Sequence, residues 1–304
     1  MAYFVKKIWA GYCVYKTILL SKNLPADFVL YYMDYAGSGD TYLCCSFLKC
    51  ANMIRDNCVF IAPGKVSGEI ARLSGFNHIR VISKVQAFNL RKLSQFCGKP
   101  FLLQPLLYES EPMIYSGVMR YMQGYRNLNF MFLLENGFSE ILNDSYEIVH
   151  WSPLVFHAKN TTEYVDSVFK KYGLKKGKTL LIAPYAGNHD LWDIPMEYYK
   201  KIADEYRKKG FSVCTNSDGS PQEVGIPGTL PICIPYAHIQ EFCRLAGYFI
   251  SIRSGLCDLL APVHLKEKRI IYPNKHLAEG PGTLIEFFSL KRMGLCQDAQ
   301  EVVY

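Results

Sequence analysis

A glycine-bearing segment near residue 40 of this 304-residue chain brings a carboxylate to a turn. It reads Gly37-Ser38-Gly39-Asp40 and lies between an apolar run at 27–33 and a longer one that starts at residue 41. Glycines let a chain turn tightly at the carboxyl end of a strand, where open α/β sheets bind ligands. Asp40 can contact a ligand there or, with equal support from the spacing, cap the helix that follows. The segment lacks the third glycine of a dinucleotide fingerprint, so NAD binding is disfavoured.

A second turn of this kind carries a cation instead of an acid. Arg253-Ser254-Gly255-Leu256 follows the apolar run at 248–252 and opens a short helical pattern. The first turn of a helix presents backbone N–H groups and partial positive charge, which suits a phosphate or diphosphate. Arg253 can add a bidentate contact to that anion. The plainer interpretation is a surface arginine beside an ordinary glycine turn.

Two further loops follow apolar runs in the second half. Asn188 lies in the polar segment after the run at 179–183. Thr215 ends the run at 211–215, and Asn216 follows it. We expect these residues to contact the same ligand as the second turn, although the segment from 215 to 219 is also an ordinary turn sequence. The chain has no H-E-x-x-H, G-x-S-x-G, P-loop or D-x-D element. Metalloprotease, serine hydrolase and P-loop NTPase activities therefore lack support, and we expect neither a metal site nor a cofactor.

The elements that must position these loops alternate between strand and helix. In the first half, the predicted strands are 27–33, 57–62, 78–83 and 101–104, with helices at 41–54, 66–73 and 86–96. In the second half, a capping box at 160–163 opens a helix, strands are predicted at 179–183, 211–215, 232–234, 248–252 and 269–272, and further helices at 195–208 and 237–246.

This alternation predicts an α/β fold with two Rossmann-like domains that face a central cleft. The boundaries are 1–150 and 151–304, with residues 105–150 unassigned, and the last residues could pack back on the first domain. A chain of this length is expected to hold two cores.

The composition narrows the class of protein. Half of the residues are hydrophobic and 20% are charged, which excludes a disordered chain. The net charge of +7 is spread along the sequence, which argues against nucleic acid and suits anionic small molecules or an acidic membrane face. No signal peptide and no run of 18 uncharged apolar residues is present, so we expect a cytoplasmic protein that could be peripheral to the membrane. The 11 cysteines form no C-x-x-C pair and lie in apolar runs, as small buried hydrophobic residues do.

The order of these loops on two Rossmann-like halves resembles that of the bacterial GT-B glycosyltransferases. Among them, the chain resembles the ADP-heptose:lipopolysaccharide heptosyltransferase-like group (glycosyltransferase family 9-like). Three stretches carry the resemblance: the Gly37–Asp40 turn, residues 172–187 (YGLKKGKTLLIAPYAG), and the turn at 254–256. That group's donor-side turn usually reads Asp-Thr-Gly-Leu-Ser/Thr-His. Here Arg253 and Ser254 replace the first two residues, and Asp258 stands in place of the histidine.

The resemblance implies an enzyme that moves a sugar from a nucleotide-diphosphate donor to a cell-surface glycan, such as lipopolysaccharide or a capsule. Asp40 would be the general base in the acceptor-side loop, and direct displacement would invert the anomeric centre without a metal. Residues 253–256 would hold the leaving diphosphate. The hexosyl, heptosyl or fucosyl nature of the donor stays open. So do two other functions: a non-catalytic nucleotide-sugar or glycan-binding protein, and a GT-B-fold sugar-nucleotide epimerase.

Overall fold

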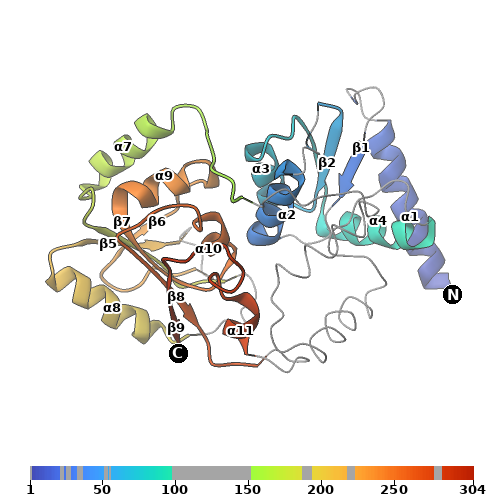
Figure 1. Cartoon of the computed structure of the whole chain (residues 1–304). Coiled ribbons are helices and arrows are strands. Elements are labelled where there is room, and N and C mark those ends of the chain that lie inside the picture. The colour runs from blue at the N-terminus through green and yellow to red at the C-terminus, as the bar shows by residue number, and fades with distance from the viewer. Residues whose placement is uncertain are drawn as a thin grey trace. The chain divides into compact units, whose positions relative to one another are not determined.

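A computed structural model gives the fold (Figure 1). The residues it describes are 2–20, 24, 29–32, 37–50, 54, 56–97, 152–186, 194–217, 223–276 and 283–304. The chain divides into two compact units, Met1–Leu154 and Val155–Tyr304, and each contains a parallel sheet with helices beside it. The predicted α/β class is therefore confirmed. The strand predicted at 101–104 and the unassigned segment 105–150 lie outside the described residues.

The first unit has a sheet with the order β1-β2-β3, paired in parallel throughout. Its central strand is apolar and completely buried, as a strand covered on both faces must be. Helices α2 and α3 lie together on one face, while α1 and α4 pack on each other at the other (Figure 1). The described elements are α1 (Ala2–Leu19), β1 (Val29–Tyr32), α2 (Ser38–Cys50), β2 (Cys58–Ala62), α3 (Lys65–Leu73), β3 (His78–Val81) and α4 (Lys84–Cys97).

Helix α1 precedes the first strand and was not predicted from the sequence. Its Val14 and Ile18 join a buried cluster with Leu90 of α4 and Ile61 of β2. A Cβ atom at Gly11 would collide with the backbone of α4, so glycine at this position permits the close approach of the two helices. Packing on α4, which is remote in the sequence, therefore stabilises α1.

The second unit has a sheet with the order β6-β5-β4-β7-β8-β9, again parallel throughout. Helix α8 packs on β4 and β5, whereas α9 packs on β4 and β7 from the opposite face and contacts α7 (Figure 1). The elements are α7 (Thr161–Tyr172), β4 (Thr179–Ala183), α8 (Met196–Lys208), β5 (Ser212–Asn216), β6 (Leu230–Ile232), α9 (Tyr236–Ala246), β7 (Gly247–Ile252), α10 (Gly255–Leu259), β8 (Glu267–Tyr272), α11 (Leu284–Phe288) and β9 (Gln300–Val303).

The core of the second unit follows from the apolar periodicity of its elements. Leu180 and Ile182 of β4 and Ile250 of β7 point to the same side of the sheet, where Tyr199 and Ala203 of α8 cover them. These residues are buried, and the buried positions of α8 recur at the 3.6-residue spacing of one helix face.

Some local predictions for this unit were wrong. Helix α7 begins where expected, but Asn160 before it has a left-handed backbone (φ 56°) and makes no side-chain cap. The hydroxyl of Thr161 instead donates to the Ala158 carbonyl at 2.8 Å. Helix α11 and strand β9 were not predicted. The last residues form β9, and Tyr304 continues the pairing by donating its backbone N–H to the carbonyl of Tyr272.

Most of the described cysteines are buried, as predicted, whereas Cys13 and Cys233 are exposed and Cys50 is half-buried. Burial raises the pKa of Cys45 and of Cys214 to about 12, so these thiols are unreactive at neutral pH. The buried cysteines among the described residues are Cys44, Cys45, Cys58, Cys214, Cys243, Cys257 and Cys296. None of the described helices has both the length and the apolar character needed to span a membrane.

Candidate functional site

The strand order of the second unit marks a place on its sheet for a ligand. Numbered along this unit, the strands run 3-2-1-4-5-6, the order of a doubly wound nucleotide-binding fold. The order reverses between β4 and β7, and ligands of such sheets bind outside the carboxyl ends of the strands at this switch point. The Ser251 hydroxyl at the end of β7 donates to the Ala183 carbonyl at the end of β4, 3.1 Å away. The two strand ends that flank the switch point are thus joined by a side chain.

The predicted second turn leaves this edge of the sheet. Strand β7 ends at Ile252, the backbone N–H of Arg253 donates to the Ile271 carbonyl of β8, and helix α10 starts at Gly255. Ser254 has an extended backbone (φ −151°) at the cap position. The turn and its short helix therefore lie at the carboxyl edge of the sheet, as the sequence predicted. The strand order places them beside the switch point.

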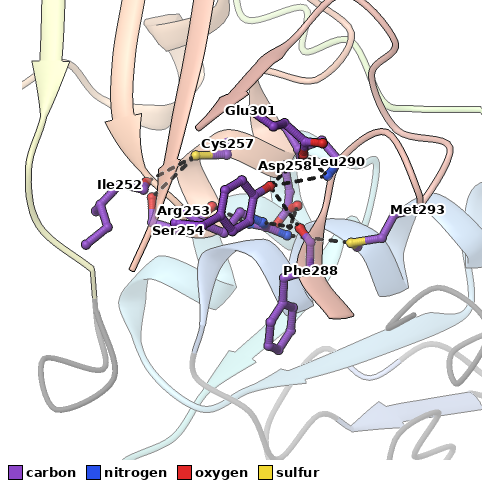
Figure 2. Close-up of polar contacts among 10 residues, drawn as sticks. Ile252, Arg253, Ser254, Cys257, Asp258, Phe288, Leu290, Met293 and Glu301 are labelled. Carbon is purple, nitrogen blue, oxygen red and sulfur yellow. Dashed lines mark hydrogen bonds and ion pairs between the residues drawn. The ribbon is translucent and has the colours of Figure 1, made fainter. Parts of the chain in front are cut away.

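The side chain of Arg253 does not project from this turn as predicted. It is 5% exposed, and its guanidinium forms a paired contact with Asp258, with Nη2 to Oδ1 at 2.7 Å and Nη1 to Oδ2 at 3.1 Å (Figure 2). Nη1 also donates to the carbonyl of Ser254 at 2.7 Å, Nε donates to that of Phe288 at 2.9 Å, and Nη2 contacts the sulfur of Met293 at 3.9 Å. All five N–H donors of the guanidinium thus have partners inside the unit.

These contacts correct the predicted role of Arg253. A bidentate contact to a diphosphate would require it to give up Asp258, which would leave a buried carboxylate without its cation. Burial opposes the charge of Arg253, but the nearby Asp258 carboxylate outweighs it and raises the pKa of the guanidinium above its ordinary value. Arg253 therefore fixes the shape of the turn, by tying α10 to the end of α11.

A second layer of contacts holds the end of α11 in place. The Tyr272 hydroxyl donates to Oε1 of Glu301 at 2.7 Å, and Oε2 of Glu301 accepts from the Ser289 hydroxyl at 2.6 Å. The backbone N–H of Leu290 also donates to Oε1 of Glu301, at 2.7 Å. Burial is the main reason that the pKa of Tyr272 lies far above its ordinary value, so its hydroxyl stays protonated. Strands β8 and β9 thus anchor the segment that Arg253 contacts.

The Thr215 hydroxyl likewise serves the fold. Thr215 is buried, its hydroxyl accepts a hydrogen bond from the backbone N–H of Ile226 at 3.1 Å, and it is hydrogen-bonded to the Thr229 hydroxyl. These contacts hold the loop between β5 and β6, so the hydroxyl does not present itself to a ligand as predicted. Asn216 is the last residue of β5 and half-buried at the same carboxyl edge. Asn188 lies outside the described residues.

The predicted acidic turn belongs to the first unit. Helix α2 starts at Ser38, and Asp40 is half-buried in its first turn. A Cβ atom at Gly37 would collide with Oδ2 of Asp40, so the carboxylate lies back over Gly37. The Thr41 hydroxyl donates to the Gly37 carbonyl at 2.9 Å and is hydrogen-bonded to the Ser67 hydroxyl of α3 at 3.0 Å. Gly37 thus leaves room for the Asp40 carboxylate in its present position, and an acid at this place is also favoured by the helix dipole.

Comparison with known proteins identifies the fold. No protein-family model and no curated protein sequence matches the chain significantly. Among solved structures, ADP-heptose LPS heptosyltransferase II from E. coli matches with a TM-score of 0.57 and 11% identity, over 90% of each chain. The family 9 glycosyl transferase from Veillonella parvula DSM 2008 matches with a TM-score of 0.56 and 12% identity, over 91% of this chain and 86% of the other. The likeness is one of fold. It confirms, at that level, the resemblance inferred from the sequence.

Sequence reasoning missed the residues that close the network around Arg253. Asp258 was noted only because it stands where the related group has a histidine. Its spacing from Arg253 was a usable signal, because Asp258 follows five positions later, across a tight turn and one turn of helix. Tyr272, Phe288 and Glu301 gave no such signal. Pairing of β8 with β9 brings Tyr272 and Glu301 together, and the packing of α11 brings Phe288 to Arg253. Within the described residues, no group of three or more His, Cys, Asp or Glu could hold a metal ion.

Proposed function

We propose that this protein is a glycosyltransferase that uses a nucleotide-diphosphate sugar as donor and a lipopolysaccharide-type or related cell-surface glycan as acceptor. The observation that carries the proposal is the 3-2-1-4-5-6 parallel sheet, with polar loops after its two switch-point strands, in a chain that shares its fold with a heptosyltransferase. In this proposal, the two units face each other across a GT-B cleft, and the protein works in the cytoplasm.

The second unit would bind the donor. The backbone N–H groups of Ser254, Gly255 and Leu256 would face the leaving diphosphate, together with Asn216 and Asn188 from the neighbouring loops. Arg253 would act through its contacts with Asp258 and Phe288, which keep the turn in the shape that presents those N–H groups. The mechanism would need no metal, because the backbone groups take up the charge that grows on the diphosphate.

The first unit would bind the acceptor through residues 37–39 and supply the base. Asp40 would remove the proton of the acceptor hydroxyl as that oxygen attacks the anomeric carbon, and the diphosphate would leave from the opposite face. The result would be inversion at the anomeric carbon. Gly37 supports this role because its lack of a side chain leaves room for the Asp40 carboxylate.

The test is a transfer assay with a panel of nucleotide-diphosphate sugars and an extracted lipopolysaccharide as acceptor, followed by mass spectrometry. Selective stabilisation of the protein by one nucleotide diphosphate in a thermal-shift screen would identify the donor nucleotide first. Transfer that depends on Asp40 supports the proposal. Binding without transfer or hydrolysis for every donor and acceptor would overturn it.

A non-catalytic nucleotide-sugar or glycan-binding protein is the second candidate, and two observations favour it. The basic side chain at the donor turn is neutralised by Asp258, and Asp40 lies where an acid also stabilises a helix. An epimerase on the same scaffold would instead convert a sugar nucleotide without any acceptor. Analysis of the free sugar nucleotide after incubation separates these two functions from each other and from transfer.

A further inference from the structure

One side of helix α1 takes no part in the core of the first unit. Gly11, Val14 and Ile18 are buried against α4 and β2, so the helix uses that side for packing. The opposite side carries Val5, Trp9, Tyr12, Lys16 and Leu20 at spacings of four, three, four and four residues. Such spacing places side chains along one stripe of a helix.

This stripe is both apolar and open to solvent. Trp9 is 66% exposed, Val5 58%, Tyr12 43% and Leu20, just beyond the helix, 72%. The Trp9 and Tyr12 rings lie 5.6 Å apart between centroids, so they form one aromatic surface. Single exposed apolar residues are ordinary on proteins, but a contiguous set indicates a surface that binds something. We call the set Val5, Lys6, Trp9, Tyr12 and Lys16 the α1 face.

Helix α1 and its packing partner α4 both carry charged side chains of one sign only. Helix α1 contains three lysines, α4 beside it contains two lysines and an arginine, and neither helix contains Asp or Glu. Lys6 and Lys16 are exposed on the same side as Trp9. Two copies of the chain that met through this face would bring lysines together without an acid from either helix. A second copy is therefore a poor partner for it.

An anionic lipid surface satisfies both properties together. Trp and Tyr favour the boundary between lipid headgroups and acyl chains, because each has an apolar ring with a polar group. Lysines beside them reach the phosphates while their alkyl chains stay in the apolar layer. A helix with this composition lies in the plane of a membrane surface and does not cross it.

We propose that the α1 face docks the first unit on a membrane surface rich in anionic phospholipid. Trp9 and Tyr12 enter the headgroup region, and Lys6 and Lys16 contact phosphates. The inference does not depend on the proposed glycosyltransferase activity, because it rests only on the exposure and charge of α1 and α4. It gives a specific site to the membrane contact that the sequence only suggested.

The experiment is cosedimentation of the full chain with two kinds of vesicle, phosphatidylcholine alone and phosphatidylcholine with one third phosphatidylglycerol. We expect binding to the anionic vesicles that weakens with added salt, and little binding to the neutral ones. Each lysine charge removed should lower the partition coefficient about five-fold, since a basic residue near an anionic surface contributes ~1 kcal/mol. The Lys6→Gln/Lys16→Gln variant should therefore bind about 25-fold more weakly.

Matched variants separate this face from general attraction by a basic protein. Lys201→Gln/Lys208→Gln removes two exposed lysines of α8 and should leave binding within about two-fold of wild type. Trp9→Ala should weaken binding, whereas Val224→Ala, at a position 61% exposed in the second unit, should not. All these side chains are exposed, so the variants should fold, which circular dichroism verifies.

The fluorescence of Trp9 reports how deeply this side chain enters the membrane. Lipids with brominated acyl chains should quench part of the tryptophan fluorescence of the wild-type protein. The Trp9→Phe variant should not show this quenching. The proposal would be overturned if the α1-face and α8 variants lost vesicle binding to the same extent, or if the wild-type protein did not bind anionic vesicles at low salt. A dimer in light scattering that Trp9→Ala abolishes, in the absence of vesicle binding, would also overturn it, because a second copy would then occupy the face.

Discussion

The guanidinium of Arg253 and the carboxylate of Asp258 form a buried ion pair in which each side chain is 5% exposed. In the group that the chain resembles, the first of these two positions is acidic and the second is a histidine. Here the cation comes first and the acid second. The pair joins the end of β7 to α10 and, through the Phe288 carbonyl, to the end of α11.

Removing Arg253 should destabilise the second unit more than it directly weakens a ligand contact. Arg253→Ala leaves the buried Asp258 carboxylate without its cation, a loss of about 3–5 kcal/mol in the free energy of unfolding. Urea denaturation measures this loss. Arg253→Met/Asp258→Leu removes both charges and should recover most of the stability. If Arg253→Ala kept wild-type stability but lost affinity for nucleotide diphosphate, the guanidinium would be a direct ligand after all.

Replacing Asp40 should abolish most of the transfer while donor binding persists. Asp40→Asn removes the proposed base, for which a loss of about two to four decades in kcat is typical. Calorimetry with the nucleotide diphosphate should show an affinity close to that of wild type. The matched control is Asp166→Asn, which removes an exposed acid paired with Lys176 and should leave kcat unchanged. Near-normal turnover by Asp40→Asn would reduce Asp40 to a helix-stabilising acid.

Gly37→Ala should act through Asp40. The new Cβ would occupy the space of Oδ2, so the carboxylate must move from its present position. We expect kcat to fall about ten-fold or more, with KM for the donor nearly unchanged, because misplacing a catalytic group is costly. The decisive measurement is the double variant: Gly37→Ala should have no further effect in the Asp40→Asn background. Additive losses would show that Gly37 acts independently of the carboxylate.

The stability of the second unit should fall in acid through Asp298. Burial opposes ionisation of Asp298, but the Cys296 thiol and the buried Lys268 ammonium outweigh it and lower the pKa of the carboxyl below its usual value. The unfolded chain therefore binds more protons than the folded one near pH 4, so folding stability rises with pH there. The stabilisation is complete above the ordinary carboxyl pKa of 3.8 and is lost as the pH falls through the lower folded value. Asp298→Asn should flatten this part of a stability–pH curve measured by urea denaturation, and an unchanged slope would contradict the assignment.

Transfer should survive removal of divalent metal. The sequence has no D-x-D element, and the proposed mechanism uses backbone N–H groups of residues 254–256 to stabilise the leaving diphosphate. Activity measured after dialysis against EDTA should equal that of the untreated protein within about two-fold. Strict dependence on added Mg²⁺ or Mn²⁺ would refute this account of the leaving group.

The sequence by itself determined the class of fold and the location of the candidate loops. Buried parallel strands appear as continuous apolar runs such as TLLIA and YFISI, and a loop that follows such a run must emerge at the carboxyl edge of the sheet. That reasoning placed Asp40 in the first turn of one helix and Arg253 just before another, and the structure has both residues at these places. It rests on local periodicity, which needs no knowledge of distant partners.

The tertiary structure alone decided what those side chains do. Whether a guanidinium is a ligand or a buried structural cation depends on groups that tertiary packing brings close. Phe288 and Met293, which contact Arg253, are more than 30 residues away from it in the chain. The same holds for the Thr215 hydroxyl, whose partners lie in the loop that leads to β6. Helix α1 escaped prediction because its apolar residues serve two surfaces, one packed on α4 and one exposed. A helix that is apolar on both sides has no clear polar face in its sequence, and only the packing of Gly11 on α4 shows which side belongs to the core.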